Sequence, residues 1–202
     1  MQLRASAVVC AARAHGEVGV ILRALTEEHG LVSAYVAGGR GRVLRPVLIP
    51  GNAVAMELKV RLASQMPSAR VELTASRAPF LAEPLPAAAM DWATALTAAV
   101  LPERHAYPSL YLALTALLDA VCHAPSARGW VPGLIAYEAL MLRELGYGDH
   151  SAPSEADWAA VLAQFDRMGQ LVARYLLADR RGDVMGAREM LRQRLGRIGG
   201  AG

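Results

Sequence analysis

The sequence predicts an α+β protein in which a small closed five-stranded β-barrel, residues 1–80, precedes an all-α domain, residues 81–202. Short apolar runs that alternate with polar residues fill roughly the first 77 positions, as in strands. After Pro79 the apolar residues recur with helical spacing instead. Three prolines between Ala78 and Pro86 separate the two patterns, which favours a semi-rigid linker at that point.

Five strands are expected in the first domain. Gly16 and Gly30 separate the first three, because glycine readily adopts the positive φ that tight hairpin turns require. The fourth strand alternates apolar residues with Glu57, Lys59 and Arg61, which indicates one buried face and one charged face. The five expected strands are Val8–Arg13, Val18–Thr26, Leu31–Ala37, Ala53–Leu62 and Val71–Ala75. Closing such short strands into a barrel removes exposed sheet edges.

Five helices are expected in the second domain. Pro108 is suited to the first turn of a helix, and Gly146 and Gly148 are suited to a helix end. Ser154 is the expected N-cap of the fourth helix, with Asp157 three residues later as a variant of the capping box. The expected helices span Pro86–Leu101, residues from Pro108 to about 121, Pro132–Leu145, residues from about 155 to 175, and Val184–Ile198.

Composition excludes several classes of protein. The two cysteines, Cys10 and Cys122, are too few for a disulfide framework or a four-cysteine zinc site, and both are expected to be buried as small apolar residues. No secretory leader is recognisable, and no apolar run approaches the length of a membrane span. We therefore expect a protein of the reducing cytoplasm, with no membrane contact, no metal and no cofactor.

Charge is divided unevenly along the chain. Residues 1–80 carry ten basic and five acidic side chains, residues 81–166 carry three and ten, and residues 167–202 carry eight and three. Almost every basic residue is arginine, since Lys59 is the single lysine. Two interpretations of the basic tail stay open: its arginines bind a separate partner, or they pair with the acidic middle segment of the same domain.

Motifs for catalysis are absent from the sequence. There is no phosphate-binding loop ending in Gly-Lys-Ser/Thr, no dinucleotide-binding glycine motif, no Gly-x-Ser-x-Gly elbow and no His-Glu-x-x-His metal motif. Asp149, His150 and Ser151 are consecutive, and adjacent residues point in different directions, so they do not predict a catalytic triad. The sequence therefore predicts a protein that is not an enzyme.

A glycine-rich basic segment, residues 38–46, is the strongest candidate for a binding site. It places Arg40, Arg42 and Arg45 within six residues, and guanidinium groups and backbone N–H groups suit phosphate oxygens. Lys59 and Arg61, on the charged face of the fourth strand, are expected to extend this surface. The alternative is a flexible solvated loop. Aromatic residues are scarce in this domain, so binding would depend mainly on charge, tolerate any sequence and weaken strongly with salt.

Four stretches of the sequence also suggest a family. They are Gly16–Thr26, Glu28–Val32, Gly38–Asn52 and Tyr137–Tyr147, the last reading YEALMLRELGY. In this order and spacing the chain resembles the bacterial RecO family of recombination mediators over roughly residues 1–148. The resemblance implies an OB-type barrel, a helical C-terminal domain and no catalytic site. It also implies that Arg40, Arg42 and Arg45 contact DNA.

The resemblance further implies binding of single- and double-stranded DNA, annealing of complementary strands, and partnership with RecR, single-strand-binding protein and, functionally, RecA. Many members insert a four-cysteine zinc module after the position of Gly148, where this chain has no cysteine, so no zinc is expected. Two other hypotheses stay open: an RNA-binding or ribosome-associated OB protein, and a protein-interaction scaffold with an incidental basic loop. An unrecognised hydrolase is a further alternative that the motif search disfavours.

Overall fold

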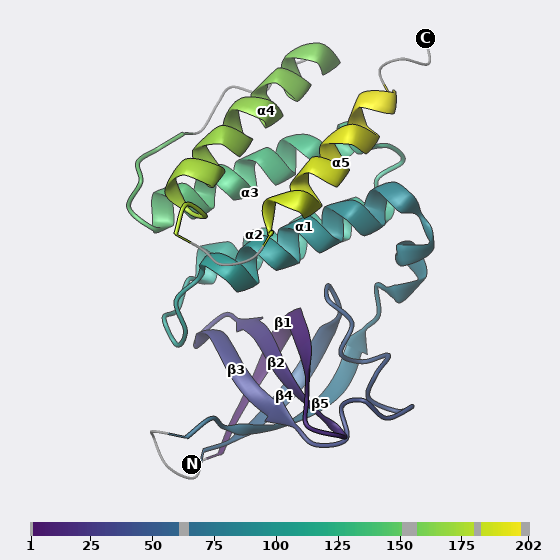
Figure 1. The fold of residues 1–202 in the computed structure, drawn as a ribbon, viewed down its shortest axis with the longest axis vertical. Helices are drawn as coiled ribbons and strands as arrows, with labels where there is room; N and C mark the ends of the chain where they lie inside the picture. Colours follow the sequence, from purple (N-terminus) through teal and green to yellow (C-terminus); the bar gives the residue numbers. More distant parts are fainter. Residues whose placement is uncertain (1, 61–64, 151–156, 180–182, 199–202) are drawn as a thin grey trace. The chain divides into compact units, whose positions relative to one another are not determined.

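The computed structural model describes residues 2–60, 65–150, 157–179 and 183–198. The strands are β1 (Gln2–His15), β2 (Gly19–Thr26), β3 (Gly30–Val36), β4 (Ala53–Lys59) and β5 (Ser68–Ala75). They are followed by helices α1 (Pro84–Val100), α2 (Pro108–His123), α3 (Val131–Glu144), α4 (Trp158–Tyr175) and α5 (Met185–Ile198), with short 3-10 turns η1 (Ala78–Ala82) and η2 (Ala127–Gly129). The predicted α+β class, a five-stranded barrel followed by a helical region, is confirmed (Figure 1).

The barrel closes because β1 is long enough to pair with two neighbours. The strand order is β1-β2-β3-β5-β4, and β1 pairs with β4 through its first half and with β2 through its second half. The register of β1 against β2 shifts between Val9 and Ala11, which is a bulge. Such a bulge bends a strand, as closure of a small barrel requires. The parallel pairing of β3 with β5, at Tyr35 and Ser68, completes the ring.

The alternation predicted for β4 is confirmed. Val54, Met56 and Leu58 are buried in the barrel core, whereas Glu57 is half-buried and Lys59 is exposed. Arg61, which the sequence placed on the same charged face, lies outside the described residues. The rest of the barrel core consists of buried apolar side chains from all five strands.

Cys10 occupies the bulge of β1 and is buried, as predicted. Burial raises the pKa of its thiol from the usual value of 9.0 to about 12, so it stays protonated at neutral pH. Cys122 is only half-buried, because its position on α2 falls at the edge of the apolar face. The expectation of burial is therefore confirmed for Cys10 and only partly met by Cys122.

The chain forms two compact units. One segment that lies between helices of the second unit in sequence belongs to the first unit. The first unit contains Met1–Ala82 together with Leu101–Tyr111, and the second contains Glu83–Val100 and Leu112–Gly202. Within the first unit, the Arg104 N–H donates to the carbonyl oxygen of Leu31 at 2.9 Å. Glu103 pairs with Arg23 at 3.6 Å and accepts a hydrogen bond from Ser33. The connection between α1 and α2 thus covers part of the outer surface of β2 and β3.

In the helical unit, α5 packs against α1 and α3 packs against α4 (Figure 1). The N-cap of α4 is Asp157, whose side chain accepts a hydrogen bond from the Ala160 N–H at 3.2 Å. The prediction that Ser154 caps this helix is therefore wrong, and Ser154 itself lies outside the described residues. Asp157 reaches the free N–H groups of the first turn directly, so α4 begins about three residues later than predicted. Gly146, with φ of 86°, ends α3 as predicted.

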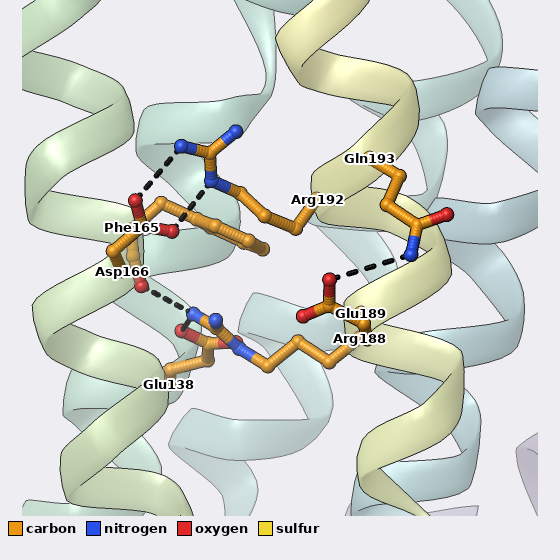
Figure 2. A network of polar contacts seen from close by, with 7 residues as sticks. All are labelled: Glu138, Phe165, Asp166, Arg188, Glu189, Arg192 and Gln193. Atoms are coloured by element: carbon orange, nitrogen blue, oxygen red, sulfur yellow. Dashed lines mark hydrogen bonds and ion pairs between the residues drawn. The ribbon is translucent and has the colours of Figure 1, made fainter.

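A buried ion pair joins four helices of this unit, and Figure 2 shows its contacts among α3, α4 and α5. The carboxylate of Glu138, on α3, is fully buried and accepts two hydrogen bonds from Arg188 of α5, both 2.9 Å long. It also accepts one from Nε1 of Trp92, on α1, at 2.7 Å. Arg188 in turn donates to the carbonyl oxygen of Phe165, on α4, at 2.6 Å, and its guanidinium lies 3.7 Å from the centre of that ring. A side chain at Gly169 would collide with this guanidinium.

A second ion pair lies one turn further along α5. Arg192 donates to both carboxylate oxygens of Asp166, at 2.5 and 2.8 Å, and this hydrogen bonding raises the pKa of Arg192 (Figure 2). Arg194 donates to the carbonyl oxygen of Pro84. Arg188 and Arg192 therefore pair with carboxylates of the acidic middle segment, which decides between the two interpretations of the tail for these two residues. Arg197 stays exposed.

Among the described residues, no helix has the length and apolar character needed to cross a membrane.

Replacing Arg188 with alanine should lower the free energy of unfolding by about 3–5 kcal/mol, because it leaves the Glu138 carboxylate buried without its counter-charge. Arg192→Ala is the matched control and should cost no more than about 1 kcal/mol, because both partners of that pair are partly exposed. Urea denaturation followed by circular dichroism measures both. The double variant Glu138→Gln with Arg188→Met removes both charges and should be more stable than Arg188→Ala. Equal losses for Arg188→Ala and Arg192→Ala would contradict the assignment.

Candidate nucleic-acid interface

The basic loop, residues 38–46, is part of a folded connection between β3 and β4. Its backbone forms successive turns: the Gly41 N–H donates to Gly38, and the Arg45 N–H donates to Gly41, each at 2.9 Å. Gly38 has φ of 69°, a left-handed conformation that favours glycine. The glycines of this segment therefore serve the conformation of the loop itself.

The far end of the connection is anchored in the barrel. Leu48 is buried in the barrel core. Asn52 is fully buried, and its Nδ2 donates to the carbonyl oxygens of Pro46 and Val47 at 2.9 and 3.2 Å. Its Oδ1 accepts a hydrogen bond from the Arg77 N–H at 2.8 Å. These contacts give the connection a defined conformation, in contrast to the alternative of a solvated loop without fixed structure.

Sequence reasoning did not assign a role to Asn52. A buried asparagine has four hydrogen-bonding positions to satisfy; here two hold the loop and a third binds the backbone of Arg77, after β5. The available signal was its place directly after Pro50 and Gly51, at the end of a loop that precedes a strand. That signal marks a turn and gives no indication of what the side chain binds.

The other end of the loop is fixed to the β1–β2 hairpin by Arg40. Its Nη1 donates to the carbonyl oxygens of Gly16 and Glu17 at 3.2 and 2.9 Å, and its backbone N–H donates to Val18 at 3.2 Å. Gly39 lies so close to Val20 that an added Cβ would be 2.8 Å from that side chain. Carbonyl oxygens orient the Arg40 guanidinium without neutralising its charge, so the group remains available to an anion.

The structure brings together two of the five predicted binding residues. Arg40 and Arg45 line the same groove, of about 480 Å³, beside Val20, Leu48 and Pro50. Arg42 is exposed on the same loop and is not part of the groove lining. Lys59 is exposed at the end of β4 and is not part of this lining, and Arg61 lies outside the described residues.

Carboxylates neutralise two arginines of the barrel unit, whereas the arginines of the basic loop have no carboxylate partner among the described residues. Arg4 pairs with Glu57 at 3.7 Å, and Arg23 pairs with Glu103. Among the described residues of positions 1–80, six cations form no ion pair with a described carboxylate: Arg13, Arg40, Arg42, Arg45, Lys59 and Arg70. Half of these six belong to the basic loop. The loop is therefore the densest group of unpaired cations in the described part of the barrel.

Asp149, His150 and Ser151, which did not predict a catalytic triad, are only partly described by the structure. His150 Nε2 lies 2.8 Å from the carbonyl oxygen of Tyr147, and Ser151 is outside the described residues. Among the described residues, no group of three or more His, Cys, Asp or Glu side chains is arranged to hold a metal ion.

Comparisons with known proteins agree on one family. Residues 1–77 match the family model described as "Recombination protein O N terminal", and residues 84–150 match "Recombination protein O C terminal". A protein named DNA repair protein RecO from Phenylobacterium zucineum is 39% identical over 149 residues, which are 73% of this chain and 60% of the relative. Proteins of the same name from Caulobacter vibrioides and Rhodospirillum centenum are each 38% identical over 149 residues, 73% of this chain, covering 60% and 58% of the relatives.

The chain thus spans about 60% of the length of the curated relatives that it matches. The matched residues include the whole barrel, the basic loop and α1 to α3. By these matches and by its fold, the chain belongs to the RecO family of DNA repair proteins.

Proposed function

We propose that this chain is a non-enzymatic recombination mediator that binds single- and double-stranded DNA, promotes annealing of complementary strands, and assists RecA loading together with RecR. The observation that carries the proposal is the basic loop, which is held at both ends and presents Arg40, Arg42 and Arg45 without carboxylate partners. The names of its relatives and its family support a role in DNA repair.

The proposed mechanism is neutralisation of phosphate charge. Two complementary strands repel each other through their backbones, and guanidinium groups that bind phosphates lower this repulsion and release condensed counterions. Because Asn52 and the Arg40 contacts hold the loop in place, little conformational entropy is lost when DNA binds. Apart from Arg40 and Arg45, the residues that line the groove are apolar, so we expect binding that tolerates any sequence.

The helical unit is proposed to serve protein partners, RecR and single-strand-binding protein, more than DNA. Arg188 and Arg192 form ion pairs with Glu138 and Asp166, which neutralise their charges. The remaining acidic side chains of the middle segment repel a polyanion. We therefore assign the principal DNA contacts to the barrel and treat Lys59 and Arg61 as secondary contacts to a longer strand.

Replacing Arg40, Arg42 and Arg45 together with alanine should weaken binding of single-stranded oligonucleotides of any sequence. With about four phosphate contacts the slope of log K against log salt is about −3 in the wild type, and it should flatten to about −1 in the variant. Fluorescence anisotropy at several salt concentrations measures the slope. The matched control replaces Arg143, Arg167 and Arg174, three exposed arginines of α3 and α4, and changes net charge equally. Equal effects of the two triple variants would remove the loop from the proposal.

Annealing tests the mediator role separately from DNA binding. Complementary oligonucleotides coated with single-strand-binding protein should anneal faster when the wild-type chain is added, and the triple loop variant should give little acceleration. Loss of fluorescence from a donor and quencher on opposite strands follows the reaction. Tight DNA binding with no acceleration of annealing would exclude the mediator role. Preference for RNA in a direct competition would favour the RNA-binding alternative.

A further inference from the structure

Tyr35 lies on the outer surface of the barrel, against a glycine. A side chain at Gly19 of β2 would collide with the Tyr35 ring, so the ring occupies the space that Gly19 leaves free. His15, at the end of β1, contacts the same ring edge-on, with centroids 6.1 Å apart and planes at 77°. Tyr35 is half-buried and His15 is exposed. Part of the tyrosine ring is thus held in place while the rest remains accessible.

Cations flank this ring along the barrel surface. The strand registers join Arg13 to Ile21, Ile21 to Tyr35, Tyr35 to Ser68, and Ser68 to Lys59. Residues directly opposite each other on neighbouring strands project to the same face. Arg13 and Lys59 are exposed, so this row faces outward and carries one cation on each side of the tyrosine.

The ring and the basic loop share the β1–β2 hairpin. Arg40 holds the carbonyl oxygens of Gly16 and Glu17, which lie between His15 and Gly19 in sequence. At the other end of β2 and β3, Glu103 occupies the outer surface through Arg23 and Ser33. The strands that carry oligonucleotides in OB folds are therefore covered at one end, and their uncovered end carries an aromatic ring beside the cations.

We propose that Tyr35, supported by Gly19 and His15, is a stacking platform for a base of single-stranded DNA whose phosphates contact the basic loop. The inference rests on the proposed function and deepens it. A base in single-stranded DNA exposes its π face and can stack on an aromatic side chain, independently of its identity. In a duplex the same faces are occupied by neighbouring bases. Tyr35 therefore adds affinity for single strands without adding affinity for duplex.

The test compares three labelled probes: an oligothymidylate, a chain of abasic deoxyribose phosphates of equal length, and a duplex. Wild-type protein should bind oligothymidylate more tightly than the abasic chain. Tyr35→Ala should weaken oligothymidylate binding about tenfold, within the range found for base–aromatic stacking, and leave abasic and duplex affinities and the salt slope unchanged. Tyr35→Phe should retain tight binding, because it keeps the ring. Tyr147→Ala, which removes a tyrosine 43% exposed in the helical unit, is the matched control and should change nothing.

Tyr35→Leu fills the space beside Gly19 without a π face, so it carries the test if the alanine variant does not fold. Equal wild-type affinities for oligothymidylate and the abasic chain, with no effect of Tyr35→Leu, would overturn the stacking platform and leave the proposed function standing. Equal weakening of all three probes by Tyr35→Leu would also overturn it, because that pattern indicates a structural role. Failure of the wild type to bind any probe would overturn the proposed function itself.

Discussion

Glu138 is fully buried and hydrogen-bonded to side chains of α1 and α5, and a carboxylate in such surroundings requires a counter-charge. Arg188 supplies it, and the position of α5 follows from that requirement. Gly169 is a glycine inside a helix, an unfavourable choice by helix propensity, because the guanidinium needs its space. The ion pair also neutralises one positive charge of the basic C-terminal tail. The basic tail, for which the sequence left a separate partner open, has the first two arginines of α5 paired with carboxylates within its own unit.

In the barrel, by contrast, the three arginines of the basic loop have no carboxylate partner among the described residues. Internal hydrogen bonds also fix the side chains of Arg40 and Asn52 in the barrel, but their acceptors there are carbonyl oxygens and not carboxylates. Arg40 is oriented by carbonyl oxygens that leave its charge intact, and Asn52 uses an uncharged amide to fix the loop backbone. Internal contacts therefore neutralise guanidinium groups in α5 and position one in the basic loop. The proposed DNA site depends on this difference between a carboxylate partner and a carbonyl partner.

Apolar runs separated by glycine turns predicted the first three strands, and period-two alternation predicted the last two, because burial of one face is a local pattern that β4 shows clearly. The predicted first strand lacked the first residues of β1, where alanine and serine carry little contrast between faces. Three features could not be predicted, because they depend on contacts between residues distant in sequence. They are the pairing of Glu138 with Arg188, the packing of residues 101–111 on the barrel, and the contact of the Tyr35 ring with Gly19. The sequence identified the arginines of the loop, and it could not indicate that Asn52 holds them in place.

The central claim is that DNA contacts the barrel loop and hairpin while α5 serves the interior of the helical unit. Amide hydrogen exchange with and without a single-stranded oligonucleotide measures this most directly. Exchange should slow in residues 15–19 and 38–46 when the oligonucleotide is added, and it should be unchanged in residues 185–198. Slower exchange in residues 185–198, with none in the basic loop, would contradict the claim.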